Sequence, residues 1–291
     1  MKKTMKKMMG ILLSLVVLSG LTACAVAEYD FKQEITVVSR EEGSGTRGAF
    51  VELLGVEKKD ESGKKVDHTT EEAVITNNTN VMMTTVAGNE GAIGYSSMGS
   101  LNDTVKALQV NGVQANAENV KNGSYTVSRP FNIATKSTPS EAAQDFMTYI
   151  LSAEGQQVVT DNGYIALDNA VSYAGKQVSG KIVIAGSSSV TPVMEKLKEA
   201  YAILNPNAEI EIQQSDSTTG MQSTMDGVCD IGMASRALKD SELEAGLVGT
   251  VIAMDGIAII VNPSNPITSM TVEEIAQIFT GETTTWEGFV K

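Results

Sequence analysis

The feature that most constrains the fold is a set of nearly unbroken apolar runs, of which Ile182 to Ala185 and Val251 to Val261 are the clearest. A strand with one face in water alternates apolar and polar residues, so such runs are typical of strands that helices cover on both faces. Segments with a helical period follow strands of this kind, as Arg47 to Leu54 follows Ile35 to Val38. The sequence therefore predicts an α/β protein.

The same patterns place further elements along the chain. Helices are predicted at Glu71 to Ala87, at Glu141 to Val159 with Pro139 and Ser140 as its start, and at Val193 to Leu204. Strands are predicted at 92–95, 105–110, 131–135 and 209–213. Asn162 to Ser179 has no clear period and reads as a linker. We expect two sheets, one on each side of it.

Composition limits the function. The chain has 291 residues, which favours about two domains. Its formal net charge of -13 disfavours nucleic acid as a partner, because binding to the phosphate backbone needs a clustered positive face. One histidine and two cysteines leave little material for a metal site or for acid–base catalysis. The sequence predicts a protein that is not an enzyme and that has no cofactor and no metal.

The N-terminus is predicted to direct the chain out of the cytoplasm. Four lysines precede the apolar run Ile11 to Leu18, which is too short to remain as a membrane-spanning helix. Leu21 to Cys24 looks like a bacterial lipobox, with residues 1–23 as a lipoprotein signal peptide and 24–30 as an anchor linker. Acylation of Cys24 would then hold the protein on the membrane. The alternative is an ordinary secretory signal with an incidental cysteine.

Three turns rich in Ser, Thr and Gly stand between a strand and a helix: Arg40 to Thr46, Gly186 to Pro192 and Gln214 to Gly220. Backbone N–H groups at a helix start are unpaired, and with the helix dipole they attract anions. Arg40, expected in an exposed turn, adds a full positive charge with planar geometry for oxyanions. The turns therefore predict an anion site. The alternative is that each turn is an ordinary helix cap.

A hydrolase that uses Ser44 is a weaker hypothesis. Its base would have to be His68, which lies in a polar stretch that reads as a solvated loop. None of the three turns is a Walker A loop or a G-x-S-x-G elbow. Cys229, with no base nearby in the sequence, is expected to be a buried apolar residue.

These residues resemble the PstS phosphate-binding proteins of ABC transporters. The N-terminal part resembles the second part of that family, at Arg40 to Arg47, Ile93 to Tyr95, Ser128 to Pro130 and Leu151 to Gln156. The C-terminal part resembles its first part, at Lys181 to Val190, Asp230 to Arg236, Met254 to Ala258 and Ile278 to Gly281. The order is reversed, as in a circular permutation; a fusion of two truncated neighbours is the rival explanation.

The resemblance implies a two-lobed periplasmic-binding-protein-like fold of type II, hinge-connected and with circularly permuted order. One lobe would be discontinuous, residues 31–129 plus 262–291, and the other contiguous, residues 130–261. The crossings between them would be Ser128 to Phe131 and Ile260 to Pro263. Because a short loop joins the corresponding segments in the family, Thr283 to Trp286 should lie near Gln33 to Ile35.

The resemblance also implies a site at the turns. The residues that it matches to phosphate ligands are Arg40, Ser44, Gly45, Thr46, Ser189, the N–H of Val190, Ser217 and Ser235. Several family members have an Asp where this chain has Ser235, and that carboxylate accepts the proton of hydrogen phosphate. Either Glu42 or Asp216 would then have to accept the proton in its place, or selectivity against sulfate would be weaker. The alternative for Glu42 is that it pairs with Arg40 and holds the guanidinium in position.

The implied function is capture of inorganic phosphate between two lobes and its delivery to the permease subunits of an ABC transporter. The implied location is the outer face of the cytoplasmic membrane, in a Gram-positive cell. The nearest alternative is the same fold binding another oxyanion, such as sulfate or molybdate. A hydrolase, or an adhesion or sensor protein that keeps the fold, is less favoured.

Overall fold

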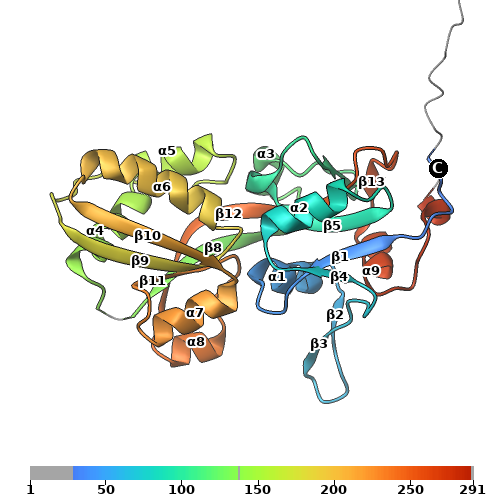
Figure 1. Ribbon diagram of the computed structural model, residues 1–291, viewed down its shortest axis with the longest axis horizontal. Helices are drawn as coiled ribbons and strands as arrows, with labels where there is room; N and C mark the ends of the chain where they lie inside the picture. The colour runs from blue at the N-terminus through green and yellow to red at the C-terminus, as the bar shows by residue number, and fades with distance from the viewer. Residues whose placement is uncertain (1–28, 137, 290–291) are drawn as a thin grey trace, which may run out of the picture.

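The computed structural model describes residues 29–136 and 138–289 and shows two α/β halves side by side (Figure 1). The chain begins with β1 (Thr36–Arg40), α1 (Gly45–Leu53), β2 (Glu57–Lys59), β3 (Lys65–Asp67), β4 (Val74–Thr76), α2 (Thr79–Ala87), β5 (Ala92–Ser97), η1 (Met98–Ser100), β6 (Lys106–Ala107), β7 (Gln109–Val110) and α3 (Ala117–Lys121). It continues with β8 (Ser128–Thr135), α4 (Glu141–Ile150), α5 (Ala153–Asp161), β9 (Gly180–Ser187), α6 (Thr191–Leu204), β10 (Ala208–Ser215), α7 (Ser217–Met225), β11 (Ile231–Ala234) and α8 (Asp240–Glu244). It ends with β12 (Val248–Val261), β13 (Ser269–Met270), α9 (Val272–Phe279) and η2 (Trp286–Phe289).

The main strands form one hydrogen-bonded path in the order β10-β9-β11-β8-β12-β5-β1-β4. The long strand β12 makes this possible, because Val248 to Gly256 pair with β8 and Ile257 to Val261 pair with β5. The expectation of two separate sheets is therefore corrected to one ladder that runs through both halves. Figure 1 shows β8 and β12 as the strands that connect them.

Two hydrophobic cores define the halves. The first half, residues 29–127 and 257–289, packs around Phe50, whose ring stacks on Tyr95 with centroids 3.9 Å apart. The second half, residues 131–253, packs around Phe146 and Tyr201. Ile257 to Val261 lie in the first core, although the predicted contiguous lobe extends to residue 261. The predicted crossing at 260–263 is corrected to Met254 to Gly256, opposite Ser128 to Pro130, because β12 is already paired with β5 beyond that point.

Two predicted helices are broken in the structure. Within 71–87, the β-branched residues Val74 to Thr76 pair with β1 instead, and the helix starts only after Asn78, whose side chain accepts the N–H of Val81. Within 141–159, Ser152 caps a new helix by accepting the N–H of Gly155. Ser140 caps α4, which confirms its predicted start. Internal Ser and Asn are favourable caps, and a helical period alone does not reveal them.

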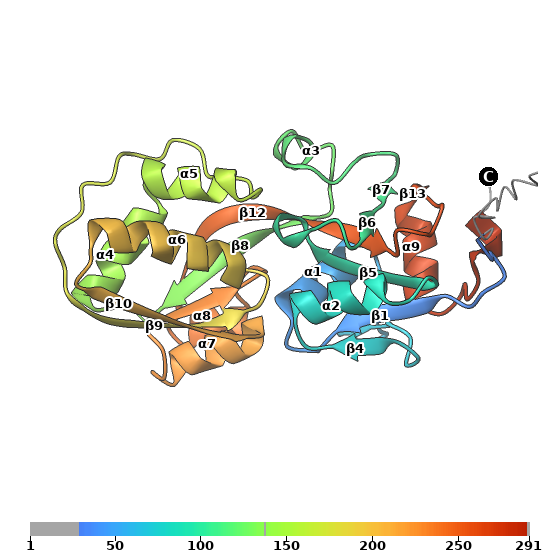
Figure 2. The ribbon, with the colours of Figure 1, turned by 45° about the horizontal axis from the view of Figure 1, so that its top comes forward.

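The two ends of the described chain meet in the first half (Figures 1 and 2). Glu34 forms an antiparallel bridge with Thr285, and the N–H of Ile35 donates to the carbonyl of Thr284 at 2.8 Å. The indole N–H of Trp286 donates to the carbonyl of Gly91. These contacts confirm the predicted proximity of residues 283–286 and 33–35.

The linker at 162–179 contains no helix or strand, yet it is fastened to the second half. The Tyr173 hydroxyl donates to the Asp145 carboxylate, which also accepts the Tyr201 hydroxyl at 2.8 Å. The Tyr173 oxygen accepts the side-chain amide of Asn205. Burial raises the pKa of Tyr173 to about 12, so this network stays uncharged at its tyrosine end near neutral pH.

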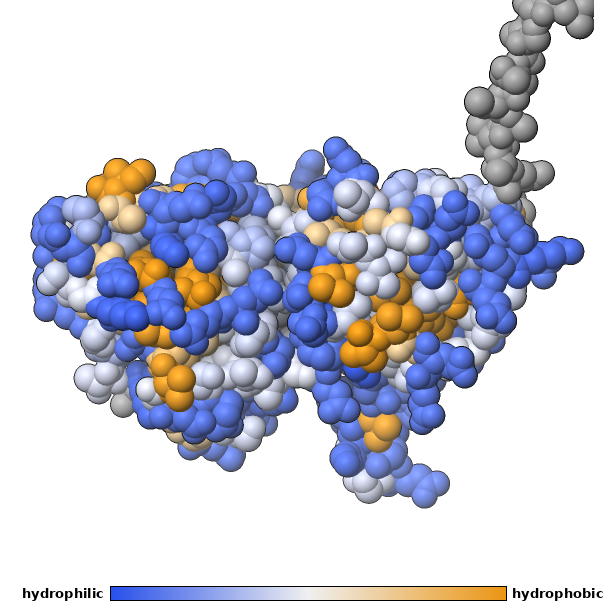
Figure 3. Space-filling model, in the orientation of Figure 1, coloured by the Kyte–Doolittle hydropathy of each residue, from blue (hydrophilic) through white to orange (hydrophobic). Residues whose placement is uncertain are grey.

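The surface of the first half carries an apolar area in the region of β4 and α2 (Figure 3), where Val74, Ile75 and Val81 are exposed. β4 is the last strand of the path, so its outer edge has no partner in the described ladder.

The predicted signal peptide and Cys24 lie outside the described residues, as does most of the predicted anchor linker. Among the helices of the described ranges, none is both long enough and apolar enough to span a bilayer.

Candidate functional site

Seven buried hydroxyl groups meet between the two halves. The first half contributes Thr46 and Thr79, and the second contributes Ser187, Ser188, Ser189, Ser217 and Ser235. We call these seven side chains the hydroxyl cluster. The Ser189 oxygen lies 2.9 Å from that of Thr46 and 3.1 Å from that of Thr79. Ser235 is central, with its oxygen 3.0 Å from Ser187 and 3.2 Å from Thr46.

Four helices begin at the hydroxyl cluster. Thr46 lies in the first turn of α1, Thr79 and Ser217 are the first residues of α2 and α7, and Ser189 stands just before α6. Each helix start has N–H groups that find no partner within the helix, and it carries the positive end of a dipole. The arrangement therefore concentrates hydrogen-bond donors and partial positive charge at one point, which suits an anion.

Arg40, the last residue of β1, brings a full charge to the cluster and is only 3% exposed. The expectation of an exposed turn is wrong, because the side chain lies between the halves. Its guanidinium donates to Ser188 at 3.1 Å and to both carboxylate oxygens of Glu41. The partner is Glu41 and not Glu42, which is exposed. The Tyr95 hydroxyl accepts the backbone N–H of Arg40, and burial raises the pKa of Tyr95 to about 12.

A second buried arginine, Arg129, stands on β8 where that strand crosses between the halves. It forms a 2.9 Å ion pair with Asp255 on β12, and the two side chains are 2% and 0% exposed. Burial lowers the pKa of Arg129, and the charge of Asp255 opposes that effect. An arginine side chain stays protonated in proteins, so the guanidinium acts only as a donor. Its Nη2 donates to Thr46 at 3.0 Å, which connects it to the hydroxyl cluster.

The two halves are in direct contact at the turns. A Cβ atom at Gly45 would lie 2.5 Å from the Ser217 oxygen and 2.9 Å from that of Ser235, so only glycine allows this approach. The carbonyl of Gly43 accepts the backbone N–H of Thr218 at 3.1 Å. The structure therefore has the halves closed on each other.

The predicted site residues behave in three ways. Thr46, Ser189, Ser217 and Ser235 belong to the hydroxyl cluster, and Arg40 and Gly45 touch it. Ser44 acts as the cap of α1, accepting the N–H of Arg47 at 3.3 Å. The N–H of Val190, predicted as an anion donor, already donates to the carbonyl of Ser187.

The two carboxylates proposed to read the phosphate proton do not join the cluster. Asp216 caps α7, with its oxygens accepting the N–H of Thr219 at 2.8 Å and the hydroxyl of Thr219 at 2.6 Å. Glu42 is exposed. Among the described residues, no hydrogen bond joins a carboxylate to any of the seven hydroxyls. The only acceptors within the cluster are therefore the hydroxyl oxygens themselves.

Sequence reasoning missed Thr79 and Arg129 as parts of this region, and it included Ser187 and Ser188 only as members of the predicted turn Gly186 to Pro192, without naming them as ligands. Thr79 was hidden inside a predicted continuous helix, and the cap Asn78 is the signal that could have found it. Arg129 sits in a strand that contributes no turn. Its signal is a charged residue at the centre of a predicted crossing.

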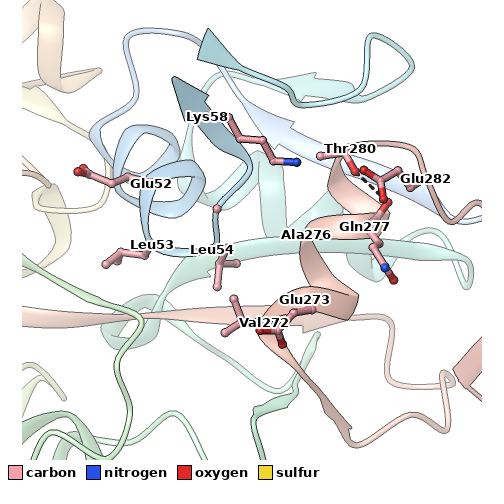
Figure 4. A pocket seen from close by; sticks show the side chains of 11 residues that line it. Glu52, Leu53, Leu54, Lys58, Val272, Glu273, Ala276, Gln277, Thr280 and Glu282 are labelled. Carbon is pink, nitrogen blue, oxygen red and sulfur yellow. Dashed lines mark hydrogen bonds between the residues drawn. The ribbon is translucent and has the colours of Figure 1, made fainter. Parts of the chain in front are cut away.

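Other features are less suited to an anion. A pocket between α1 and α9 is lined by Glu52, Glu273 and Glu282 against one cation, Lys58 (Figure 4). His68 is exposed, its backbone N–H donates to the carbonyl of Val56, and no hydrogen bond of the described residues joins its side chain to Ser44. The hydrolase hypothesis therefore gains no geometric support.

Comparison with known proteins agrees with a two-halved solute-binding fold. A family model described as "PBP superfamily domain" matches residues 27–154 and 171–288, which places the chain in that superfamily. Phosphate-binding protein PstS 2 of Streptococcus agalactiae serotype V is 53% identical over 288 residues, covering 96% of this chain and 98% of the relative. The chain therefore belongs to the PstS family.

One solved structure and one more distant relative add detail. The crystal structure of a phosphate ABC transporter phosphate-binding protein from Streptococcus pneumoniae TIGR4 has a TM-score of 0.70 and 44% identity, covering 89% of this chain and 100% of that one. Phosphate-binding protein PstS of Borreliella burgdorferi is 32% identical over 112 residues, which is 38% of this chain and 40% of the relative.

Proposed function

We propose that the protein is an extracytoplasmic receptor that binds inorganic phosphate between its two halves and delivers it to an ABC permease. The observation that carries the proposal is the hydroxyl cluster at the start of four helices, with Arg40 beside it. Such a set of donors suits a small tetrahedral oxyanion. The printed names of the S. agalactiae relative and the S. pneumoniae structure support phosphate as that anion.

Binding must involve movement of the halves. The oxygens of Thr46 and Ser189, which come from opposite halves, are 2.9 Å apart and leave no room for a phosphate between them. Phosphate therefore enters after the halves separate about the crossings at 128–130 and 254–256. The anion then makes contacts to both halves that it cannot make in the open form, and it shifts the population toward closure.

We propose that phosphate contacts Arg40, Gly45, Thr46, Ser189, Ser217 and Ser235, with Ser44 shaping the α1 turn as its cap. Thr79 and Ser188 join this set because both accept hydrogen bonds from Arg40, and Thr79 is also hydrogen-bonded to Ser189. The same donors would also bind sulfate or molybdate. Hydrogen phosphate carries a proton that sulfate lacks, and a site without a carboxylate to accept that proton distinguishes the two anions less well.

The permuted order is part of the proposal. A linear alignment can follow only one of two exchanged parts, and the B. burgdorferi match covers only 40% of that protein. The S. agalactiae relative matches over nearly its whole length, so it has the same order. A shared order favours native permutation over an isolated fusion of truncated neighbours.

The anchor is proposed from the sequence. Acylation of Cys24 would hold the receptor on the outer face of the cytoplasmic membrane of a Gram-positive cell, next to its permease. Expression of the full chain in a Gram-positive host tests this: the protein should partition into detergent, and Cys24→Ala should release it into the medium. Release of the unchanged protein would contradict the anchor.

Isothermal titration with phosphate, sulfate, molybdate and arsenate tests the ligand. We expect saturable one-to-one binding of phosphate and its close analogue arsenate, with sulfate and molybdate weaker. Binding of sulfate or molybdate in preference to phosphate would assign the fold to another oxyanion. Absence of binding to all four anions would contradict the site.

A further inference from the structure

We propose that Arg129 and Asp255 form a positioning pair in the hinge, which fixes the Thr46 hydroxyl as a hydrogen-bond donor to the bound anion. This inference rests on the proposed binding of phosphate and assigns a specific role to two residues that are not themselves proposed ligands. It follows from the place of the pair in the fold and from the direction of three hydrogen bonds.

The pair lies on the two strands that connect the halves. Arg129 on β8 and Asp255 on β12 are direct partners in the antiparallel register. Asp255 also accepts the backbone N–H of Gly99, in the first half's η1 turn. Since both strands are central in the continuous sheet, the pair keeps its place while the halves move about it.

From this fixed position Arg129 reaches both halves. Its Nη2 donates to the Thr46 hydroxyl of the first half at 3.0 Å, and its Nε donates to the Ser235 carbonyl of the second half at 3.1 Å. A planar guanidinium can make both bonds at once, whereas a lysine ammonium is a single point of charge. Arg129 therefore makes hydrogen bonds to both halves only when the halves are closed.

The bond to Thr46 sets the direction of its hydroxyl proton. A threonine hydroxyl has one donor hydrogen and two acceptor lone pairs, and arginine can only donate. Arg129 therefore occupies a lone pair of Thr46 and leaves its O–H to donate into the cluster, where Ser189 lies 2.9 Å away. A hydroxyl held in this way meets an oxyanion already oriented, and the positive charge behind it strengthens the bond.

Asp255 makes this placement of a buried charge tolerable. An isolated guanidinium that is 2% exposed would be costly, and the carboxylate at 2.9 Å compensates it. The contact joins Nη1 to Oδ2, so Nη2 and Nε remain available for Thr46 and Ser235. The pair thus holds the arginine in place without using the donors that face the cluster.

A double-mutant cycle on the full chain tests the role. The pair is deleted as Arg129→Met with Asp255→Leu, which avoids an uncompensated buried charge. Thr46→Val removes the hydroxyl. Phosphate affinity is measured by titration in the wild type, in both variants and in their combination. We expect pair deletion to weaken binding by about thirtyfold with Thr46 present, the usual loss for a bond from a charged donor, and by less than about threefold in the Thr46→Val background.

The matched control deletes another arginine–carboxylate pair, Arg236→Met with Glu242→Leu, which has no bond to Thr46. Its effect should be the same with and without Thr46→Val. If the deleted hinge pair does not fold, Arg129→Lys replaces it, since it keeps the charge but not the fork; it too should weaken binding only when Thr46 is present. An equal loss in both backgrounds would overturn the positioning role, while a wild type that fails to bind phosphate would overturn the proposed function instead.

Discussion

The two faces that meet at the hydroxyl cluster differ in charge. The face from the first half carries Arg40 together with Thr46 and Thr79, whereas the face from the second half contributes only serine hydroxyls to the cluster. A charge attracts an anion over several ångströms, but a neutral hydroxyl acts only at hydrogen-bond distance and in one direction. From this difference we expect phosphate to bind first to the first half, and the second half to add its bonds on closure.

The largest expected effect is at the charged face. Arg40→Ala should abolish tight phosphate binding, at a cost of about 2 to 5 kcal/mol, because it removes a buried charged donor and leaves Glu41 facing the cleft. Lys181→Ala, which removes an exposed cation paired with Glu211, is the control and should bind normally. Titration and thermal unfolding of both variants measure this; binding within threefold of wild type would remove Arg40 from the site.

Closure itself can be blocked at the contact between the faces. In Gly45→Ala the new methyl group meets the Ser217 and Ser235 oxygens, which should cost about 1 to 3 kcal/mol only when the halves close. Small-angle scattering with saturating phosphate should show a more open variant. Gly48→Ala is the matched control, because a Cβ atom there has no neighbour within 4 Å. A Gly45 variant that closes like wild type would contradict the proposed contact.

The neutral face should respond more weakly. Ser188→Ala removes one acceptor for Arg40 and for the N–H of Thr79, so we expect about a tenfold loss of phosphate affinity. Ser62→Ala, on the exposed β2–β3 hairpin, should have no effect on binding. A loss as large as that of Arg40→Ala would erase the distinction between the two faces.

Much of the fold was predictable from local patterns. The apolar runs identified the central strands because burial on both faces leaves a continuous signature, as in β9 and β12. The split of the predicted helix 71–87 was not predicted, because Val74 to Thr76 gain their strand conformation from pairing with β1, a tertiary contact. The boundary at 261 was misplaced for the same reason: one apolar strand serves both cores.

The candidate site was predictable where it is local. Turns between strand and helix place Thr46, Ser189 and Ser217 at helix starts, and the residues alone indicate this. Arg129 contributes through a strand, and its partner Asp255 lies 126 positions away in the sequence. No pattern within either segment reveals that pairing, since the sheet register creates it.

A smaller effect concerns stability rather than binding. Burial raises the pKa of Glu242, but hydrogen bonds from Arg236 and from the N–H of Lys239 outweigh it and hold the pKa below its usual value. A lowered pKa contributes stability above the unfolded-state pKa, and this is lost as the pH falls through the folded-state pKa. Glu242→Gln should therefore lower the melting temperature near about pH 7 and have less effect near about pH 3. An equal loss at both values would contradict the ionic contribution.

The smallest expected effect tests whether a carboxylate accepts a hydrogen bond from the protonated oxygen of the phosphate. Both carboxylate oxygens of Asp216 accept hydrogen bonds from Thr219, and Glu42 is exposed. Neither residue is therefore placed to accept a hydrogen bond from a phosphate in the hydroxyl cluster. Asn is an equivalent cap, which makes Asp216→Asn a mild change to the fold. Competition titrations should give the same phosphate-to-sulfate ratio for wild type, Asp216→Asn and Glu42→Gln. A phosphate-to-sulfate ratio that falls in either variant would identify the substituted residue as the acceptor. A fall in Asp216→Asn would mean that the face from the second half also carries a charge. A fall in Glu42→Gln would mean that the face from the first half carries a second charge.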